Sequence, residues 1–521
     1  MTGYAQLWGA SPGAWAGAAA AWGGLTDPVE RRRAGLGERA AALRDGWSGG
    51  AATAADGRLG AFRDELAGLL PAVLEIDQVL AEFAGRLRVA KARLADAVAL
   101  ADRTGVEIDR HGGAAGAGSA AAAVDQVAAA LRDALALADA ADRETAARLD
   151  ELSAAARAGW TEPPPPGRPA AEADPAAVRA WWAGLTPAQR RWLTVHESGL
   201  VGRLDGVPVA ARDQANRLLL AGHREALLAE RRELLGRSPR GAWELAALRR
   251  VEEHLGGVDA LAGRLAAERT PRPYLLGLDP RGDGRAIVAL GNPDRADRVL
   301  TYVPGMTADL GDAPGELSRA GRVLARCATI APGEETAAVL WLDYDAPDFL
   351  PEAARSTQAT DAAPALHRFQ EGLRATHEGP PARQTVLGHS YGSVVVGAAA
   401  RDHGLGADAL VFVGSPGVGV DRAEALRLPP GQVWSSTAPD DVIRLVEPPG
   451  QLAGRAVLAA SPLATAVSLL RPSDHELWFG HDPSDPGFGG RTFPSGRYGH
   501  TGYWEPGNPA LDGMARIVLG R

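Results

Sequence analysis

The chain has a single cysteine, Cys327, so it cannot form an intramolecular disulfide framework. This cysteine lies in an apolar, helix-like stretch, which indicates a buried structural thiol rather than a nucleophile. No apolar run approaches the about 20 residues that a membrane-spanning helix needs. Residues 1–25 also lack the basic start and the apolar core of a classical signal peptide. We therefore expect no transmembrane segment and a cytoplasmic location.

Lysine is equally scarce, because Lys91 is the only one and arginine supplies the remaining positive side chains. The formal net charge is −9, so no overall basic field attracts nucleic acid or anionic lipid. Arginine clusters such as Arg31–Arg33 are interpreted as solvated faces. With 521 residues, the chain has room for two or three domains that each bury a core.

The N-terminal part shows long helical patterns. Between Leu66 and Leu94 the apolar residues recur in steps of three and four, which predicts a long helix packed against another long helix. This heptad seam consists of Leu66, Leu69, Val73, Ile76, Leu80, Phe83, Leu87, Ala90 and Leu94. Pro71 marks either the first turn of this helix or a kink. A second helical pattern runs from about Ala120 to Ala156, after a glycine-rich connector at residues 111–116.

A Trp47-Ser48-Gly49 turn separates the first long helix from a helical pattern that ends at Asp45. A helix, a W-x-G turn and a second long helix resemble the WXG-type helical hairpins that type VII secretion systems export, over about Leu25 to Asp102. The resemblance implies export without a classical signal peptide, and a homodimer or a helical partner docked on this region. The alternative interpretation is a helical packing domain without such a role.

Composition predicts the domain boundaries. The proline-rich run at residues 162–169 indicates an extended linker. We therefore predict a helical hairpin or bundle domain over residues 1–160, a linker over 161–175, a helical connecting region over 176–270 and an α/β domain over 271–521. In the connecting region, Thr186 and Pro187 have the residue types expected of a helix N-cap and first helical position.

The C-terminal half alternates short apolar strands with helical patterns. The strands are expected at Tyr274–Leu278, Arg285–Leu290, Arg298–Val303, Ala338–Leu342, Gln384–Leu387, Ala409–Val413 and Gln432–Ser436. Helical patterns lie between several of them, at Gly315–Thr329, Ala363–His377 and Ser393–Arg401. This alternation predicts a mostly parallel sheet flanked by helices, with functional sites at the carboxyl ends of the strands.

Residues 388–392 read Gly-His-Ser-Tyr-Gly between two apolar runs. This G-x-S-x-G in a strand–turn–helix context resembles the nucleophile elbow of α/β-hydrolases, in which a sharp turn lifts a serine hydroxyl clear of the sheet. We therefore predict Ser390 as a nucleophile. His389 is not expected to act as its base, and a buried, structurally satisfied histidine is the preferred interpretation.

A serine nucleophile needs a histidine base that a buried carboxylate orients, and in this fold the chain order is Ser, acid, His. After the strand that ends at Ser436, both Asp440 and Asp441 stand two residues before an aliphatic side chain, which is typical of the acid turn. We predict Asp440, which is nearer the strand end, and keep Asp441 as the alternative.

Three histidines follow, at positions 475, 481 and 500. His500 precedes a last amphipathic pattern at Pro509–Leu519, which is the position expected of the base. His481 lies in an irregular loop, where it is either a plain loop residue or a contact to the substrate; we predict the contact.

The transition state of acyl transfer needs two donors for the oxyanion. We predict the backbone N–H of Tyr391, after the nucleophile, and that of Met306, after the third strand of the expected sheet. Gly305 opens the turn before Met306 and is expected to border the substrate. This loop lacks the HGGG pattern of many esterases.

Several stretches together are similar to a family of largely uncharacterised α/β-hydrolases of high-GC Gram-positive bacteria. They are residues 385–393, 413–419, 482–489 and 499–500, with 201–208 and 211–217 upstream. The resemblance covers about Ala176 to the C-terminus. It implies an α/β-hydrolase fold and a Ser–Asp–His arrangement, but no known substrate.

These features predict an α/β-hydrolase domain behind an all-α N-terminal domain, acting as a serine hydrolase on a small-molecule acyl ester. An amidase or peptidase with the same triad is the alternative enzyme, and a non-catalytic partner-docking protein is the alternative of another class. We expect no cofactor, no metal and no nucleic acid. The segment Glu447–Leu470 is either a lid over the site or a filler excursion.

Overall fold

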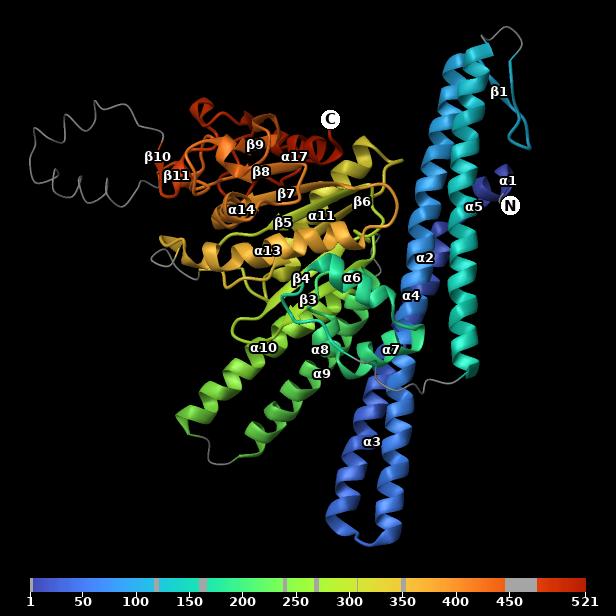
Figure 1. The fold of residues 1–521 in the computed structure, drawn as a ribbon, viewed down its shortest axis with the longest axis vertical. Coiled ribbons are helices and arrows are strands. Elements are labelled where there is room, and N and C mark those ends of the chain that lie inside the picture. Colours follow the sequence, from blue (N-terminus) through green and yellow to red (C-terminus); the bar gives the residue numbers. More distant parts are fainter. Residues whose placement is uncertain are drawn as a thin grey trace, which may run out of the picture.

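The computed structural model describes residues 3–116, 121–158, 165, 167–237, 241–266, 271–306, 308–347, 353–445 and 476–521. Figure 1 shows two regions side by side: long N-terminal helices on one flank, and a sheet covered by helices on the other. The predicted fold class, a mostly parallel α/β sheet behind a helical N-terminal region, is confirmed. Residues 161–164 and 166 of the predicted linker lie outside the described residues, as do His475 and the segment Glu447–Leu470.

In the described residues, the N-terminal region consists of five helices and a β-hairpin whose strands have two residues each. The helices are α1 (Tyr4–Gly9), α2 (Pro12–Gly23), α3 (Thr26–Gly46), α4 (Gly50–Thr104) and α5 (Ala121–Ala158), and the hairpin strands are β1 (Glu107–Ile108) and β2 (Ala114–Ala115). The W-x-G turn joins α3 to α4, and Gly49 at its end has a φ of 111°. Pro71 lies inside α4 rather than in its first turn, because the helix begins at Gly50, well before the apolar seam starts at Leu66.

The upper half of the predicted heptad seam is confirmed. Leu80, Phe83, Leu87, Ala90 and Leu94 are buried, and most of them pack in one cluster with Val127, Leu131, Ala134, Ala138 and Ala141 of α5. The lower half differs, because Leu69 is exposed and Leu70 and Leu74 are buried instead. In this part α4 packs on α3, α7 and α9, which approach it from a different side than α5.

The connecting region is helical, as predicted. It contains α6 (Pro175–Ala183), α7 (Pro187–His196), α8 (Ser198–Val201), α9 (Val209–Gly236) and α10 (Ala242–Ala266). Thr186 forms the predicted cap of α7 within a capping box, since its side chain accepts the Gln189 N–H and the Gln189 side chain accepts the Thr186 N–H. Among the described residues, no helix is both long and apolar enough to cross a membrane.

The sheet of the C-terminal half has eight strands in the order β12-β9-β8-β7-β5-β6-β4-β3. The strands are β3 (Pro273–Asp279), β4 (Arg285–Leu290), β5 (Arg298–Val303), β6 (Thr336–Leu342), β7 (Arg383–His389), β8 (Ala409–Val413), β9 (Val433–Ser436) and β12 (Arg491–Thr492). Only β4 runs antiparallel to its neighbours. The seven predicted strands are confirmed, whereas β12 was missed because two residues carry no detectable periodicity.

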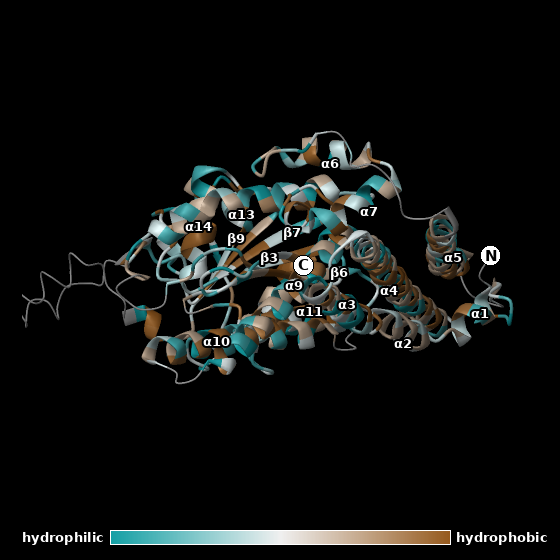
Figure 2. Ribbon diagram, turned by 90° about the horizontal axis from the view of Figure 1, so that it is seen from below, coloured by the Kyte–Doolittle hydropathy of each residue, from teal (hydrophilic) through white to brown (hydrophobic). Residues whose placement is uncertain are grey.

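Helices cover both faces of this sheet. They are α11 (Ala313–Ile330), α13 (Thr357–Thr376), α14 (Tyr391–Asp402) and α17 (Pro509–Leu519). Figure 2 shows α13 and α14 on one face and α11 on the opposite face, where α17 packs against α11. Short 3-10 turns at Ala423–Leu426, Pro430–Gln432, Val442–Leu445 and Pro486–Phe488, and the small hairpin of β10 (Glu476–Leu477) and β11 (Gly480–His481), complete this half.

The edge strand β3 is covered by side chains of α9. Asp213 accepts the N–H of Leu275 at 2.7 Å, and Arg212 donates to the Leu276 carbonyl at 2.8 Å. Asn216 donates to the Leu275 carbonyl at 3.1 Å. An exposed edge strand invites pairing with other chains, and these bonds occupy the groups that would do so. The motif at residues 211–217 therefore closes one end of the sheet.

The same aspartate connects the sheet to the N-terminal helices. Arg272, at the start of β3, binds Asp213 at 2.8 Å and Asp77 of α4 at 2.5 Å. Gln78 of α4 donates to Asp213 and to the Ala210 carbonyl, both at 2.9 Å. Two carboxylates therefore share one buried guanidinium, and this pairing offsets the cost of burying their charges.

A buried aspartate gives the fold a specific pH dependence. Asp294 accepts the Val209 N–H at 2.7 Å and the Thr376 hydroxyl at 2.5 Å, and burial raises its pKa to about 7. The folded state therefore binds a proton that the unfolded chain releases near pH 4, so the stability contribution of this group falls as pH rises from about 4 to about 7.

We predict that Asp294→Asn removes this loss, because the amide reproduces the donor and acceptor of the protonated carboxyl group. The stability of the variant relative to wild type should rise with pH by up to about 1.4 kcal/mol per pH unit within that window. Denaturant unfolding at several pH values measures it. Asp283→Asn, at an exposed loop position, is the matched control, and an equal response of both variants would contradict the prediction.

Candidate active site

The turn between β7 and α14 carries Ser390 in a strained backbone conformation. Its φ is 52° and its ψ is −129°, and Arg427 is the only other non-glycine residue with positive φ in the described part of the chain. A side chain in this region typically costs about 1–3 kcal/mol, and such outliers cluster at functional sites. The geometry is that of a sharp strand-to-helix turn with the serine at its apex.

Two glycines make this turn possible. A Cβ at Gly392 would lie 2.3 Å from the Val303 carbonyl oxygen, and a Cβ at Gly305 would lie 2.7 Å from Cβ of Ser390. Both distances are far below van der Waals contact, so only glycine permits α14 and the loop after β5 to approach each other. Gly305 therefore borders Ser390 directly, and its predicted contact with a substrate stays a prediction.

Three side chains from separate loops meet at this apex. Nε2 of His500 lies 2.9 Å from Oγ of Ser390, and Nδ1 of the same ring lies 2.8 Å and 3.1 Å from the two carboxylate oxygens of Asp441. The loops follow β7, β9 and β12, so all three reach the carboxyl edge of the sheet. This is the geometry of a nucleophile, a base and an orienting acid.

The prediction of Asp440 as the orienting carboxylate is wrong. Asp440 is exposed, and its carboxylate accepts the N–H of Gly499 at 3.2 Å, one residue before the base. The Asp441 N–H donates to the Ala438 carbonyl, and this turn directs the Asp441 side chain inward until it is completely buried. Both aspartates stand two residues before an aliphatic side chain, so the sequence allowed either as the carboxylate beside His500. The direction of the turn places Asp441 there.

Asp441 is held in its charged form by donors on several sides. The hydroxyl of Tyr503 donates to it at 2.5 Å and accepts the Ala438 N–H, while the Ile443 N–H donates to its other oxygen. Burial opposes ionisation of Asp441, but the hydrogen bonds of His500 and Tyr503 outweigh it and hold the pKa below its usual value. Tyr503 was not found from the sequence, because no pattern shows where a buried tyrosine hydroxyl will point.

His389, the neighbour of the nucleophile, supports the base rather than replacing it. Its ring is buried, and Nε2 lies 2.9 Å from the backbone carbonyl of His500, so this nitrogen carries the proton. Burial, followed by the proximity of His500, lowers the pKa of His389 to about 3, which keeps the ring neutral. Nδ1 has no hydrogen-bond partner among the described residues. The sequence predicted a buried histidine with its hydrogen bonds made, and the structure shows this for one of its two ring nitrogens.

The predicted oxyanion donors lie on the two segments that flank Ser390. Tyr391 is the first residue of α14, where a backbone N–H has no partner inside the helix. The loop that contains Met306 is held from behind by Tyr344, whose hydroxyl lies 2.7 Å from the Pro304 carbonyl and 3.3 Å from that of Gly305. Both segments therefore have fixed positions next to the serine.

His481 is the last residue of β11 and precedes a loop that contacts the end of strand β9. Its Nε2 is 3.1 Å from the carboxylate of Asp485, which also caps the turn at Pro486–Phe488. The same loop is bound to the end of β9, because Ser435 donates to the Pro483 carbonyl and Thr437 pairs with Ser484. The contact of His481 with a substrate stays a prediction.

The Gly-Ser-Pro-Gly segment after β8 supports the elbow. Ser415 accepts a hydrogen bond from the Ser393 hydroxyl at 2.7 Å and donates to the Gly417 carbonyl at 3.0 Å. A Cβ at Gly397 of α14 would lie only 2.0 Å from the Val418 carbonyl oxygen. This segment therefore packs tightly on α14. Among the described residues, no group of three or more His, Cys, Asp or Glu side chains is arranged to hold a metal ion.

Comparison with known proteins agrees with the fold of the C-terminal half. Residues 279–451 match a family model described as alpha/beta hydrolase. The Uncharacterized protein Rv2079 of Mycobacterium tuberculosis is 32% identical over 387 residues, which cover 68% of this chain and 56% of that protein. The Uncharacterized protein Mb0988c of Mycobacterium bovis is 33% identical over 192 residues, which cover 35% of this chain and 71% of that protein.

The chain thus spans little more than half the length of the first of these relatives, and the names of both state no activity. No solved structure gives a significant match to the chain.

The two neighbouring aspartates provide a matched test of the site. We predict that Asp441→Asn slows the reaction of Ser390 with a fluorophosphonate probe by roughly 10³-fold or more, because His500 loses the partner that fixes its tautomer. Asp440→Asn should change the rate by less than about 10-fold, because it touches only a backbone amide of the base loop. Active-site labelling rates measure both, and an equal loss in the two variants would contradict the assignment.

Proposed function

The chain belongs to the α/β-hydrolase family, and from this premise we propose that it is a serine hydrolase that cleaves a small-molecule acyl ester. The observation that carries the proposal is the pair of contacts on His500, 2.9 Å to the Ser390 hydroxyl and 2.8 Å to the buried Asp441 carboxylate. A serine hydroxyl is a weak nucleophile until a base accepts its proton, and this arrangement supplies the base.

In the proposed mechanism, Oγ of Ser390 attacks the ester carbonyl while Nε2 of His500 accepts the hydroxyl proton. The resulting imidazolium is stabilised by Asp441, which stays ionised. The tetrahedral intermediate then expels the alcohol, to which His500 returns the proton, and leaves an acyl-enzyme. A water molecule, deprotonated by His500, attacks the acyl carbonyl, and the acid product leaves with Ser390 restored.

The backbone N–H groups of Tyr391 and Met306 are the proposed oxyanion donors. Their support is the position of Tyr391 at the start of α14 and the contact of Gly305 with Ser390. Such donors act on charge that develops only in the transition state, and loss of one typically costs about 3 kcal/mol. Gly305 in this role borders the substrate carbonyl, and His481 is retained as a proposed contact to the remainder of the substrate.

Ester and amide cleavage use the same residues and differ in the leaving group. An alcohol leaves more readily than an amine, so the ester is the substrate class that makes the smaller demand on this site. An amidase or peptidase remains the alternative within the same chemistry. Hydrolysis of a matched ester and amide that share one acyl group distinguishes the two.

The test is labelling of the folded protein by a fluorophosphonate probe, followed by assay on acyl esters of increasing chain length. We predict labelling at Ser390 that is abolished in Ser390→Ala and reduced by roughly 10³-fold or more in His500→Ala. His111→Ala, at an exposed position between β1 and β2, is the matched histidine control and should keep the labelling rate. Folded wild-type protein that does not react with the probe would refute the proposal.

A second candidate function rests on the lower part of the α3–α4 hairpin. Between residues 26 and 69 only Ala40 and Ala67 are buried, while Leu43, Trp47, Phe62 and Leu69 are exposed. Figure 1 shows this part extending beyond the remaining helices. Two helices without a shared core need a further surface to bury their apolar side chains. We propose that the hairpin docks a second copy of this chain, which agrees with the WXG-type resemblance.

We predict a concentration-dependent dimer that is weakened by the double substitution Phe62→Ser and Leu69→Ser, measured by analytical ultracentrifugation. Leu235→Ser, at an equally exposed leucine of α9, is the matched control and should leave the association unchanged. A monomer at all concentrations would exclude the dimer, and equal association in both variants would exclude docking through this hairpin; neither result would affect the proposed hydrolase.

A further inference from the structure

The first 25 residues of the chain contain no charged side chain and no histidine. Three tryptophans, Trp8, Trp15 and Trp22, occur in this segment at intervals of seven residues, and alanine and glycine make up most of the remainder. Neither the proposed reaction nor the packing of the hydrolase fold explains this composition.

The segment forms helices α1 and α2, which lie against α4 on the outside of the N-terminal region (Figure 1). The only lysine of the chain holds them there, because Nζ of Lys91 donates to the carbonyls of Trp8 and Ala10 at 2.8 Å and 2.6 Å. Leu7 and Ala19 are the only buried residues of the two helices. The segment therefore has a fixed place but an uncovered outer side.

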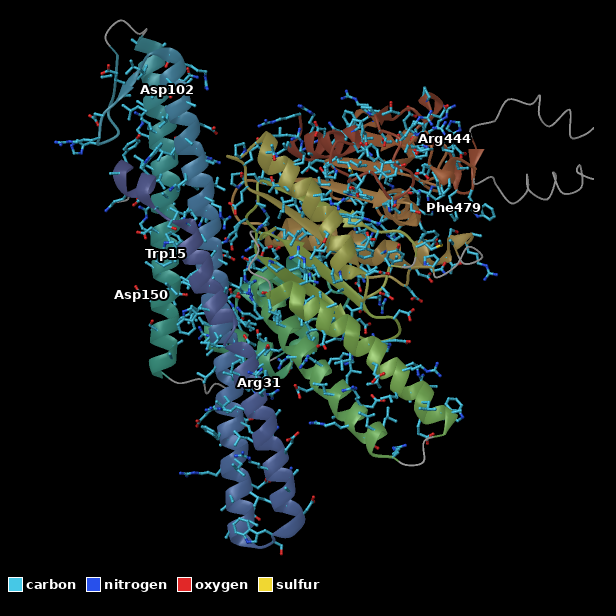
Figure 3. The ribbon with its side chains drawn as sticks, turned by 180° about the vertical axis from the view of Figure 1, so that it is seen from behind. Trp15, Arg31, Asp102, Asp150, Arg444 and Phe479 are labelled. Atoms are coloured by element: carbon cyan, nitrogen blue, oxygen red, sulfur yellow. The ribbon has the colours of Figure 1, made fainter. Side chains whose placement is uncertain are left out.

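The large apolar side chains that this segment exposes are the three tryptophans and Leu25, which we call the tryptophan face. Their exposed fractions are 53% for Trp8, 42% for Trp15, 39% for Trp22 and 44% for Leu25. Figure 3 labels Trp15 on this flank of the molecule, well separated from Phe479 near the carboxyl edge of the sheet.

Contacts at the inner edges of the rings hold two of these tryptophans in position. The Trp15 ring packs edge-on against Phe83 of α4, with 5.0 Å between ring centroids, and the Trp8 ring stacks on Tyr4 at 6.1 Å. The rings are thus supported from within and present their remaining surface outward. An apolar helix such as α2 is normally buried on all sides, and in the described residues it is covered only on the side of α4.

We propose that the tryptophan face is a membrane-docking surface, on which α1 and α2 lie flat at the boundary between lipid head groups and acyl chains. Tryptophan prefers this boundary, because its ring is apolar and its N–H finds polar partners there. With 12 residues, α2 is far too short to span the about 30 Å of hydrocarbon. An interfacial position is the arrangement that fits a short, uncharged helix with exposed tryptophans.

The absence of charge favours lipid over a protein partner. Protein–protein interfaces surround their apolar centre with a polar rim, and the segment has no ionic side chain with which to form one. It also predicts the character of the binding. A surface that docks through charges loses affinity in salt, whereas burial of tryptophan and leucine does not. The net charge of −9 likewise supplies no overall attraction to anionic lipid.

This docking surface is independent of the proposed hydrolase, since it is built entirely from α1, α2 and the residue Leu25, and no residue of the candidate active site belongs to it. Failure of vesicle binding would leave the reaction of Ser390 with a fluorophosphonate unaffected, and the reverse holds as well.

The test is flotation of the full chain with vesicles of pure phosphatidylcholine at low and at high salt. We expect binding at both salt concentrations, and a reduction of roughly 10-fold or more in the triple variant Trp8→Ser, Trp15→Ser and Trp22→Ser. Trp243→Ser is the matched control, because this tryptophan is 81% exposed at the start of α10 and should leave binding unchanged. Circular dichroism establishes that the variants keep their helices.

A second measurement avoids the folding of the variants. Vesicles with brominated acyl chains should quench part of the wild-type tryptophan fluorescence, and to the same extent in Trp243→Ser. Wild-type protein that neither floats with vesicles nor is quenched would overturn the proposal. So would self-association that the triple variant abolishes while vesicle binding is absent, because the face would then be an interface between two copies of the chain.

Discussion

The conformation of Ser390 is the constraint on which the remainder of the site depends. A serine with φ of 52° is held against a local cost of about 1–3 kcal/mol, so the surroundings must leave the turn no alternative. They do so by close packing. Strand β7 and helix α14 are almost completely buried, and a Cβ at Gly392 or Gly305 would overlap the neighbouring backbone or Ser390 itself. The energy that maintains the strain therefore comes from burial of the strand and the helix on either side.

The three side chains of the candidate site are also held in place by the sequence neighbours of one another. His389, beside the serine, donates to the carbonyl of His500. Asp440, beside the acid, accepts the N–H of Gly499, which precedes the base. Tyr503, three residues after the base, donates to Asp441. Each loop thus holds another loop as well as its own side chain of the site. The relative positions within the site depend on hydrogen bonds between residues that lie 59 to 111 positions apart in the chain.

The helical half is connected to the sheet by buried polar contacts rather than by apolar packing alone. Glu82 of α4 accepts hydrogen bonds from Tyr274 and Asn292 and pairs with Arg295 and Arg148. Together with the Asp77–Arg272–Asp213 cluster, it places charged side chains of α4 in contact with the start of β3 and the loop before β5. A charge left without its partner in such a cluster is costly, so α4 has one favoured position against the sheet. The domain boundaries expected from composition stay a prediction, because α4 takes part in both regions.

The sequence by itself determined the fold class and seven of the strands. It also predicted that Ser390 and His500 lie next to each other. These features rest on local information: apolar periodicity, glycine spacing and the order of motifs along the chain. It also predicted which residues are buried in the upper part of the α4 seam, where the single helix α5 covers the apolar face of α4.

Only the tertiary structure decided in which direction side chains point and which residues they meet. The turn after β9 directs Asp441 inward and leaves Asp440 in solvent, although both have the same spacing to an aliphatic residue. Tyr503, His389 and the covering of β3 by Asp213 and Asn216 depend on which side chains meet across the fold. The exposure of Leu69 and of the tryptophan face depends on which helices lie nearby. Periodicity shows that a surface is apolar, but the neighbours that cover it come from distant parts of the chain.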